Sequence, residues 1–476
     1  MLIHDKMPVL RLLRYAATAR ITNANLAEVE AAFAEDTKTL EGAAASPSRS
    51  SDSSLSSFRP EVECVPVLSL CLAFFDMGPI FTDSEAAAAS SQSYSTQLCI
   101  IPVTVNLSGL SREAVSSLQC RALDAVNATM NCLRRIDAFS LWHVVLPGSP
   151  KSPYRLCLLD LVSAAAPQHR LKALAVIHSF VSRTGGFFPQ AGSGRRGGGT
   201  SSFIPVYASL AESLEEAHLS LCETIERSAD FCFITSAAKT LALLVRKCPY
   251  ERFASGSAVI SRVMRTSAYL IEYDNPVSQI AGLNLLLSVL SLNPGESVLP
   301  AAVVDDSYRM LLHIAYPSNN NSRTLDNNVR YVALQNLGQL VSVNFGPIAS
   351  NADVLQASLE GVFLLDRDGS IVLHSLRLFR ILAKHEPVPS SGRPPPLMQF
   401  WLPFLRPRIF QLVEERGDSI LKAALCDCLS AIGEHVYQQL PLDKRERIDY
   451  GAQISQESKV QFSYRALVPN IPSQPL

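Results

Sequence analysis

The feature that most constrains the fold is a helical phrase that returns at a nearly constant interval. The stretch 326–340, DNNVRYVALQNLGQL, opens with an acidic residue and spaces its apolar side chains three and four residues apart, and DGSIVLHSLRLFRIL repeats this arrangement from Asp368. When the first apolar residue is taken as an anchor, the shared pattern is an Asp before it, a small or apolar pair four and five residues after it, and an apolar residue eight after it. The anchors of the five copies are Phe233, Val277, Val329, Ile371 and Ile420.

The interval between copies predicts an array of helix pairs. Successive anchors lie 44, 52, 42 and 49 residues apart, close to the roughly 40 to 47 residues per helix pair in HEAT and armadillo arrays. Each copy has an Asp at its start that can cap a helix, although Asp418 stands two residues before its anchor and the other four stand three before theirs. The apolar stripe is about 140° wide, so one helix cannot bury it alone.

A second amphipathic segment precedes each of the later copies and predicts the first helix of each pair. These segments are 256–272, 299–315, 351–365 and 397–415. An earlier pair is expected around His169, which is followed by apolar residues at the same offsets. A Leu-rich helical protein without a repeat also spaces apolar residues in this way, and that alternative stays open.

Composition narrows the class of protein. The chain has 476 residues, of which 47% are hydrophobic, so it can bury a large core. Its 42 basic and 43 acidic residues give a net charge of -1, which provides no global field for nucleic acid or an anionic membrane. Apolar stretches are shorter than the roughly 20 residues of a membrane-spanning helix. Eleven cysteines without a C-x-x-C pair predict reduced thiols and an intracellular protein, in the cytoplasm or the nucleus.

Composition also predicts where the chain is irregular. Helical spacing is clear in 207–229, where Leu210, Leu214, Ala217, Leu221 and Ile225 form one stripe. We expect an irregular N-terminal region at 1–105 with Ser/Ala-rich linkers, a helical domain at 106–253 with a Gly-rich insertion at 189–202, HEAT-like repeats at 254–440, and an irregular tail at 441–476. Within the N-terminal region, the stretch CVPVLSLCLAFFDMGPIF leaves open one or two helices followed by a loop.

Two short motifs invite a catalytic or metal-site interpretation. Ser236 and Lys239 match S-x-x-K, but the S-D-N and K-T-G elements that accompany a nucleophilic serine are missing. Glu215 and His218 match one half of a di-iron site, but such a site needs a second pair and further Glu residues. The sequence therefore predicts no catalytic residue, no metal site and no cofactor.

The exposed side of the repeated helices is the candidate binding surface. Positions two and six after each anchor point away from the buried stripe, where hydrogen-bonding, cationic and apolar groups would suit a protein segment or partner helix. The predicted protein-binding residues are Lys239, Gln279, Tyr331, Gln335, Leu373, Arg377 and Lys422. A solvated ridge without a ligand is the alternative, since scattered exposed apolar residues are ordinary.

The alternative function is a nucleic-acid-associated adaptor. It would use the Arg-Gly loop 192–199, GSGRRGGG, together with the cations of the ridge. The loop lacks the G-K-[ST] ending of a phosphate-binding loop. Nucleic acid is therefore the less favoured partner, and a flexible loop is the simpler interpretation.

The block from about 106 to 253 resembles a known family. The phrases DAFSLWHVVLPG, SFIPVYASLAESLEEAHLSL and KTLALLVRKCPYERF are similar to the uncharacterised domain of the HEAT repeat-containing protein 6 family. The residues at the matching points are Trp142, Pro147, Phe203, Pro205, His218, Pro249, Tyr250 and Arg252. The resemblance implies an armadillo-like helical fold and no established enzymatic site.

Taken together, these observations predict an all-α protein, an α-solenoid of HEAT/armadillo-type helix pairs. It is expected to act as a non-enzymatic scaffold that binds a protein or peptide partner along the ridge of second helices.

Overall fold

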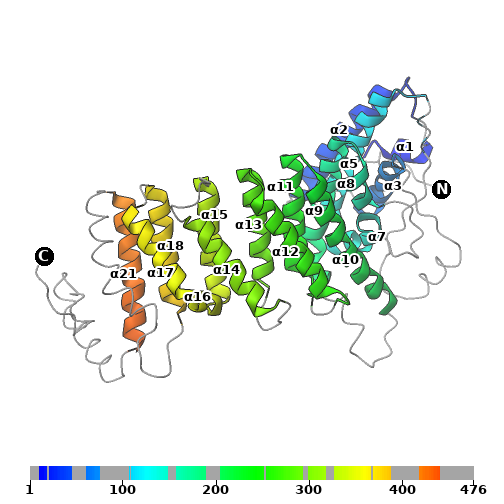
Figure 1. Ribbon diagram of the computed structural model, residues 1–476. Coiled ribbons are helices and arrows are strands. Elements are labelled where there is room, and N and C mark those ends of the chain that lie inside the picture. Colours follow the sequence, from blue (N-terminus) through cyan, green and yellow to red (C-terminus); the bar gives the residue numbers. More distant parts are fainter. Residues whose placement is uncertain are drawn as a thin grey trace, which may run out of the picture. The chain divides into compact units, whose positions relative to one another are not determined.

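The computed structural model describes thirteen stretches of the chain, and their regular structure is α-helical apart from 3-10 turns at 185–188 and at Tyr250. These are residues 10–18, 21–45, 60–75, 105, 107, 109–147, 157–188, 204–250, 253–292, 299–317, 326–365, 368–386 and 418–439. They divide into two compact units, Met1–Tyr273 and Asp274–Leu476. Each unit is an α-solenoid of stacked helix pairs, which confirms the predicted fold class (Figure 1).

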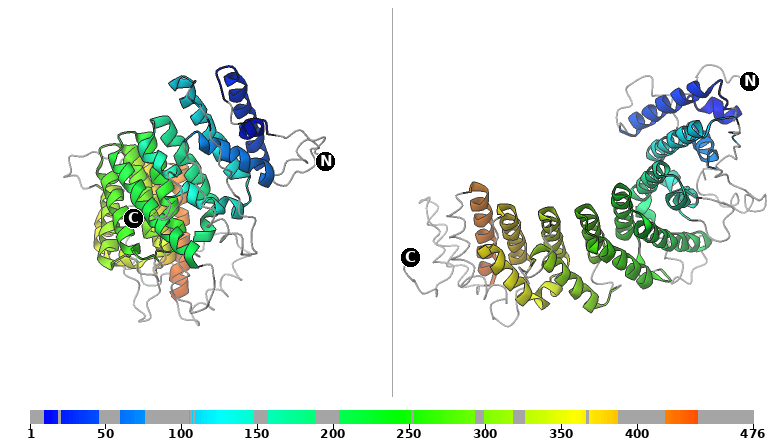
Figure 2. Two further views of the ribbon diagram at one scale, coloured as in Figure 1. Left: turned by 90° about the vertical axis from the view of Figure 1, so that its right-hand side faces the viewer. Right: turned by 45° about the horizontal axis from the view of Figure 1, so that its top comes forward.

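In unit 1 one layer consists of four long helices that each pack on the next along the chain. They are α2 (Leu26–Ala45), α5 (Arg112–Cys132), α9 (Pro167–Thr184) and α11 (Phe231–Lys247). A second set packs against them: α3 (Pro60–Ala73) on α5, α8 (Leu158–Ala164) on α9, and α10 (Ile204–Arg227) on α11 (Figure 2). The last helix of the unit, α12 (Gly256–Glu272), packs in turn on α10. The remaining short helices are α1 (Leu13–Thr18), α6 (Arg135–Ser140) and α7 (Trp142–Val145).

The N-terminal region is more regular than the sequence suggested. Residues 1–105 were expected to be irregular, yet α1, α2 and α3 lie there. Val29, Phe33 and Leu40 bury one side of α2, and the buried carboxylate of Asp36 accepts the backbone N–H groups of Arg11 (2.9 Å) and Leu12 (2.8 Å). This carboxylate fixes the segment that leads into α1, a contact between distant residues that local composition does not reveal.

Unit 2 repeats the same plan. Its second helices, those that carry the repeated pattern, are α13 (Pro276–Leu290), α15 (Asn327–Val343), α18 (Gly369–His385) and α21 (Ser419–Gln439), and each packs on the next. The first helices are α14 (Ala301–Ala315) and α17 (Ala352–Leu365), with the short α16 (Gly346–Ser350) between α15 and α17. These helices and α12 confirm three of the four predicted first segments, and the fourth, 397–415, lies outside the described residues.

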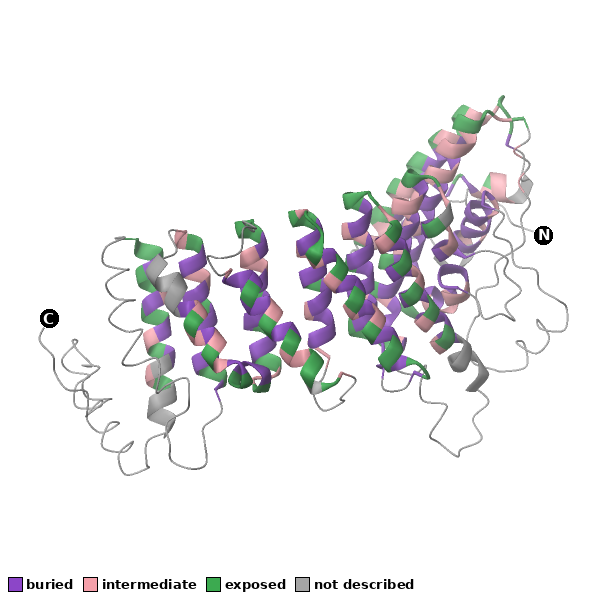
Figure 3. Ribbon diagram, viewed as in Figure 1, coloured by how far each residue is buried: buried purple, intermediate pink, exposed green. Residues whose placement is uncertain are grey.

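Five second helices begin directly after a side-chain cap, and this cap defines their common register. The caps are Asp230, Asn275, Asp326, Asp368 and Asp418, each of which accepts a backbone N–H of the first turn. The third residue after each cap is buried: Phe233, Ser278, Val329, Ile371 and Leu421 are at most 2% exposed. Burial recurs at the positions seven and eleven after the cap in the four helices from α11 to α18 (Figure 3).

This register corrects two of the predicted anchors. Val277 is 48% exposed and Ile420 is 59% exposed, so neither is equivalent to the buried Phe233. In α13 the cap is Asn275 rather than the neighbouring Asp274, because Pro276 suits the first helical position. In α21 the cap is the Asp418 that stood at the wrong offset, which moves the buried position to Leu421.

Neighbouring second helices of unit 2 are joined by a repeated hydrogen bond. The side-chain amide of Asn336, ten residues after its cap, donates to the carbonyl of Leu283, eight after the preceding cap, at 2.8 Å. Cys428 of α21 and Leu376 of α18 occupy the same two positions, and the Cys428 thiol donates to the carbonyl at 2.8 Å. The two helices α15 and α18 also approach closely at Gly338, where an added Cβ would lie 2.9 Å from Ile381 Cδ1.

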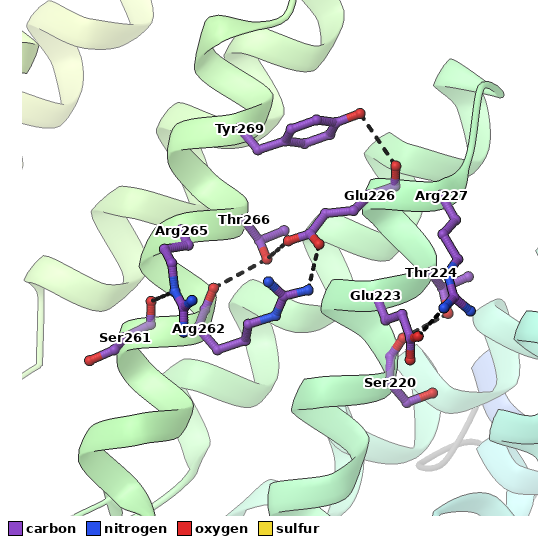
Figure 4. A network of polar contacts seen from close by, with 10 residues as sticks. All are labelled: Ser220, Glu223, Thr224, Glu226, Arg227, Ser261, Arg262, Arg265, Thr266 and Tyr269. Carbon is purple, nitrogen blue, oxygen red and sulfur yellow. Dashed lines mark hydrogen bonds and ion pairs between the residues drawn. The ribbon is translucent and has the colours of Figure 1, made fainter.

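In unit 1 a polar network fixes α12 to α10 (Figure 4). The carboxylate of Glu226 forms an ion pair with Arg262 and accepts the hydroxyl of Thr266 at 2.8 Å. The hydroxyl of Tyr269 donates to the backbone carbonyl of Glu226 at 3.3 Å. These contacts place α12 in unit 1, so the division of the chain falls after Tyr273 and not after residue 253 as expected.

Candidate binding surface

The cap-based register shows which side chains of unit 2 face solvent at equivalent positions. Nine residues after the cap stand Asn284, Gln335, Arg377 and Asp427, and all four are exposed. Five residues after the cap, the half-buried Ile280, Tyr331 and Leu373 form an apolar row beside them. The polar side chains thus form one row across consecutive second helices, and the apolar side chains form a second row parallel to it.

The predicted site residues divide according to this register. Tyr331, Gln335, Leu373 and Arg377 lie on the two rows of α15 and α18, as exposed or half-buried side chains. Lys239 occupies the equivalent exposed position of α11, in unit 1. Whether any of them binds a partner stays a prediction.

Two of the predicted residues do not lie on the rows. Gln279 is only 4% exposed, because it stands four residues after its cap, where α11 and α18 are also buried, so its predicted exposure is wrong. Lys422 is exposed but stands at the same off-row position. Because of this one-residue error in register, the prediction did not include Asn284 and Ile280. Both residues lie on the rows when Asn275 is taken as the cap.

The polar row ends at an ion pair. Asp427 accepts Arg380 of α18 at 3.1 Å. By contrast, the side chains of Asn284, Gln335 and Arg377 make no hydrogen bond or ion pair with any residue that the structure describes. We call these three residues the open polar row, since their donors and acceptors face solvent without a partner.

Tyr331 is held in a fixed position between α15 and α18. Its hydroxyl donates to Asp368 Oδ2 at 2.9 Å, and its ring lies 5.3 Å from the His374 ring at an interplanar angle of 36°. Asp368 also accepts the side-chain amide of Asn327 at 2.6 Å and the backbone N–H of Ser370 at 2.8 Å. The cap of α18 therefore positions the aromatic member of the apolar row as well.

The surroundings of Asp368 and His374 shift the pKa values of both side chains. Partial burial would raise the pKa of Asp368, but the hydrogen bonds from Tyr331 and from backbone N–H groups together lower it below its ordinary value. Burial first, and then the nearby Arg377 guanidinium, lower the pKa of His374. At neutral pH the ring of His374 is consequently uncharged, and Arg377 carries the positive charge of the row.

The two rows together have the chemistry that binds an extended peptide. A side-chain amide offers both a donor and an acceptor, as a peptide bond does, and Arg can pair with a carboxylate through two hydrogen bonds. Packed helices lie roughly 8 to 10 Å apart, and three residues of extended chain span about 10 Å. One member of the open polar row is thus available for every third residue of a peptide that crosses the helices.

The two motifs of possible chemical interest have other partners in unit 1. Ser236 donates its hydroxyl to the carbonyl of Cys232, one turn earlier, at 2.9 Å. Glu215 accepts the backbone N–H of Ser255 at 3.4 Å. No group of three His, Cys, Asp or Glu side chains suited to a metal ion occurs among the described residues.

His218 and Tyr250, two of the family-like residues, form a buried pair. The Tyr250 hydroxyl lies 2.5 Å from His218 Nε2, and His218 Nδ1 lies 2.6 Å from the carbonyl of Leu214. The second contact requires a proton on Nδ1, so Nε2 accepts from Tyr250. The pair joins the turn after α11 to the middle of α10, which is a structural role.

Two further expectations concern membranes and nucleic acid. Among the helices that the structure describes, none is both long enough and apolar enough to cross a membrane. The Arg-Gly loop 192–199 and the tail 441–476 lie outside the described residues. The nucleic-acid alternative, which depends on that loop, stays a prediction.

Comparison with known proteins adds a domain of unknown function and distant structural likenesses. Residues 117–295 match a family model described as a domain of unknown function (DUF4042). An engineered protein is 15% identical over 58% of this chain and 96% of its own, with a TM-score of 0.36. Kap121p is 12% identical over 96% of this chain with a TM-score of 0.38, and this chain spans 50% of Kap121p. Likenesses at this level assign no site, and the chain is described by its own geometry as a helix-pair α-solenoid whose residues 117–295 match a domain of unknown function.

Proposed function

We propose that the chain is a non-enzymatic scaffold whose unit 2 binds an extended segment of a protein partner along the open polar row and the apolar row. The observation that carries this proposal is the open polar row itself: Asn284, Gln335 and Arg377 stand at one register position of three consecutive helices and lack partners among the described residues. Polar groups at a folded surface are solvated at no cost, but their regular spacing matches a repeating polymer such as a peptide backbone.

The apolar row supports the same function. Ile280, Tyr331 and Leu373 are half-buried, so a bound peptide could complete their burial without a rearrangement of the helices. Tyr331 is already fixed by Asp368, which lowers the entropy lost on binding. We further propose an intracellular location, in the cytoplasm or nucleus, which is supported by the described cysteines, since none of them forms a disulfide.

The block at 106–253 is also part of this proposal. We assign it to the HEAT repeat-containing protein 6 family, which is supported by the match of residues 117–295, a stretch that overlaps most of this block, to a domain of unknown function. The buried contact of His218 with Tyr250 explains why these two residue types would recur in such a domain.

The test is a selection of peptides from a random display library against the whole chain, followed by titration of the selected peptides. The triple variant Asn284→Ala, Gln335→Ala, Arg377→Ala should weaken binding by about 10-fold or more, since each lost contact to a ligand contributes roughly 0.5 to 1.5 kcal/mol. The matched control is Asn328→Ala, Gln339→Ala, Lys384→Ala, which removes two amides and one cation from exposed positions off the rows. Equal affinity of both triple variants would refute the proposal.

A further inference from the structure

The three second helices that carry the open polar row contain no acidic side chain of their own. The sequences of α13, α15 and α18 include neither Asp nor Glu, and their basic residues are Arg330, Arg377, Arg380 and Lys384. The described acidic residues beside them in the chain lie at the helix ends: Asp274, Asp326 and Asp368 before the helices, and the buried Glu386 after α18. On a chain whose net charge is -1, these three helices therefore carry charge of one sign.

Among the other described residues of unit 2, acidic side chains belong to the first helices and to α21. Asp305 and Asp306 lie in α14, and Asp353 lies in α17. On α21, Asp427 occupies the row position but pairs with Arg380 at 3.1 Å, and Glu434 stands two turns further along. In the described part of unit 2, a carboxylate at the row position is thus found on α21 alone, where a cation already neutralises it.

Arg377 is the cation of the open polar row, and its guanidinium has no partner among the described residues. The carboxylates that act on the residues beside it are engaged by other groups. Asp427 pairs with Arg380, and Asp368 accepts the Tyr331 hydroxyl at 2.9 Å. A ligand that reaches Arg377 would therefore meet a cation that is not already neutralised.

The remaining titratable groups near Arg377 do not supply a negative charge. Burial first, and then Arg377, lower the pKa of His374, whose ring is uncharged at neutral pH. Arg330 of α15 is a further cation, and its charge acts on Asp368. The next helix, α21, adds the exposed Lys422. This surface consequently complements a negatively charged ligand better than a positive one.

We propose that the partner segment bound on the rows is acidic, and that one of its Asp or Glu side chains pairs with Arg377. This inference rests on the proposed function, whose site it shares. Arg presents a planar pair of N–H donors that matches a carboxylate, and charge complementarity of this kind sets specificity more than affinity. The half-buried Leu373 stands one turn before Arg377, so the segment also needs apolar residues, and a run of acidic residues alone would leave the apolar row uncovered.

The order of the open polar row also fixes how the segment would lie. Asn284 on α13 and Gln335 on α15 are uncharged amides, whereas Arg377 on α18 is a cation. The position that follows, on α21, is closed by the ion pair of Asp427. Within the row, positive charge is therefore found at one end. The acidic residue should lie over α18, with uncharged residues over α15 and α13.

The experiment compares peptides selected by the whole chain with those selected by a charge-reversed variant. A display library of random twelve-residue peptides is selected in parallel on the wild type and on Arg377→Glu. Because Arg377 is exposed and has no partner among the described residues, the variant should fold, which circular dichroism checks. We expect Asp and Glu to be enriched in peptides from the wild type, and Lys and Arg to be enriched in peptides from the variant.

Synthetic triplets of peptides measure the preference directly. Each triplet is one selected sequence with Glu, Gln or Lys at the enriched position, titrated by fluorescence anisotropy. The wild type should bind the Gln form about threefold and the Lys form about tenfold more weakly than the Glu form, as expected for an exposed ion pair and its reversal. In Arg377→Glu the order of the Glu and Lys forms should reverse. The matched control is Lys384→Glu, which makes the same change of charge two turns further along α18 and should keep the wild-type order.

Photo-crosslinking tests the orientation of the bound segment. A photoreactive residue next to the Glu should attach to α18 or α21, and one at the uncharged end of the same peptide should attach to α13. Mass spectrometry of the digested products identifies the attached helix. Attachment of the acidic end to α13 would contradict the proposed orientation.

The outcomes separate this proposal from the function on which it rests. Equal affinity of the Glu, Gln and Lys forms would overturn the acidic partner, even where the triple alanine variant of the row loses binding and so supports the scaffold. Peptides that bind the triple alanine variant as tightly as the wild type would refute the row as a site, and the acidic preference with it. A reversal in Lys384→Glu as large as that in Arg377→Glu would assign the preference to overall charge and would also overturn the role of Arg377.

Discussion

At the scale of single residues, His218 shows how the core of unit 1 accommodates a polar side chain. Both ring nitrogens have partners, the Leu214 carbonyl and the Tyr250 hydroxyl. Burial lowers the pKa of His218 to about 4, and the hydrogen bond to Leu214 opposes this only in part. The neutral ring satisfies both contacts, whereas a protonated ring would lose its acceptor for Tyr250.

This arrangement predicts a stability that falls in mild acid. The unfolded chain protonates His218 near pH 6.5, but the folded chain does so only near pH 4, so the contribution is complete above pH 6.5 and decreases below it. Urea unfolding at pH 7, 6 and 5 should give a slope that is about 1.4 kcal/mol per pH unit smaller in His218→Gln than in the wild type. His143, whose pKa burial also lowers to about 4, continues to titrate in the variant. An unchanged slope would contradict the assignment.

Gly256 is a second residue whose identity is dictated by its surroundings. A Cβ at this position would lie 2.0 Å from the Tyr250 carbonyl oxygen, which belongs to the backbone and cannot turn aside. We expect Gly256→Ala to lower the free energy of unfolding by about 3 kcal/mol, as measured by urea denaturation. Gly42→Ala is the control: it lies in α2 with no atom within 4 Å of the added methyl group and should raise stability by up to about 1 kcal/mol. Similar effects of the two variants would be inconsistent with the close contact.

At the scale of helices, the sequence predicted the second helices and three of the first helices, because apolar periodicity reports directly on which side of a helix is buried. It misjudged the register of α13 and α21 by one residue. Asp274 and Asn275 are both good caps, and periodicity alone does not choose between them. The error moved Gln279 onto the predicted ridge and left Asn284 off it, although Tyr331, Gln335, Leu373 and Arg377 were placed correctly as exposed or half-buried residues.

The helices of the N-terminal region were missed for a different reason. The contact of Asp36 with the backbone of Leu12 joins residues that are far apart in the chain, so a local sequence pattern does not predict it.

The bond between neighbouring second helices makes a testable contribution. Asn336→Ala removes the side-chain amide that reaches Leu283 and leaves a small cavity, so it should cost about 1 to 3 kcal/mol of stability. The adjacent Gln335 is exposed and makes no such bond, and Gln335→Ala should change stability by no more than about 0.5 kcal/mol. Thermal and urea unfolding of both variants measure the difference. A cost at Gln335 as large as that at Asn336 would argue against the repeated hydrogen bond.

At the scale of the whole molecule, the chain is two solenoid units, each held by contacts between successive helices. Stability in such arrays is approximately a sum of helix-pair and nearest-neighbour contributions. The contacts of α12 therefore contribute to the stability of unit 1. Arg262 and Thr266 of α12 bind Glu226, and Gly256 packs against the backbone of Tyr250.

Truncation distinguishes the observed division from the predicted one. A fragment 1–273 should unfold in one cooperative transition, while 1–253, which lacks α12, should lose several kcal/mol because the apolar side chains of α12 no longer cover α10. Urea unfolding followed by circular dichroism, with limited proteolysis of each fragment, provides the measurement. Equal stability of both fragments would support a boundary between the two units at residue 253.

The cap-based register has a consequence for how chains of this kind can change in length. Each residue advances the helix by 100°, so a single insertion within the first turns of a second helix would rotate the side chains that follow it by 100° and turn the buried stripe away from its neighbours. An insertion in the connection before the cap rotates nothing. Successive caps here are separated by unequal stretches, while the distance from cap to solvent-facing side chain stays constant. Variation in length is thus confined to connections, and a docking partner would meet the same order of side chains whatever the loops between them contain.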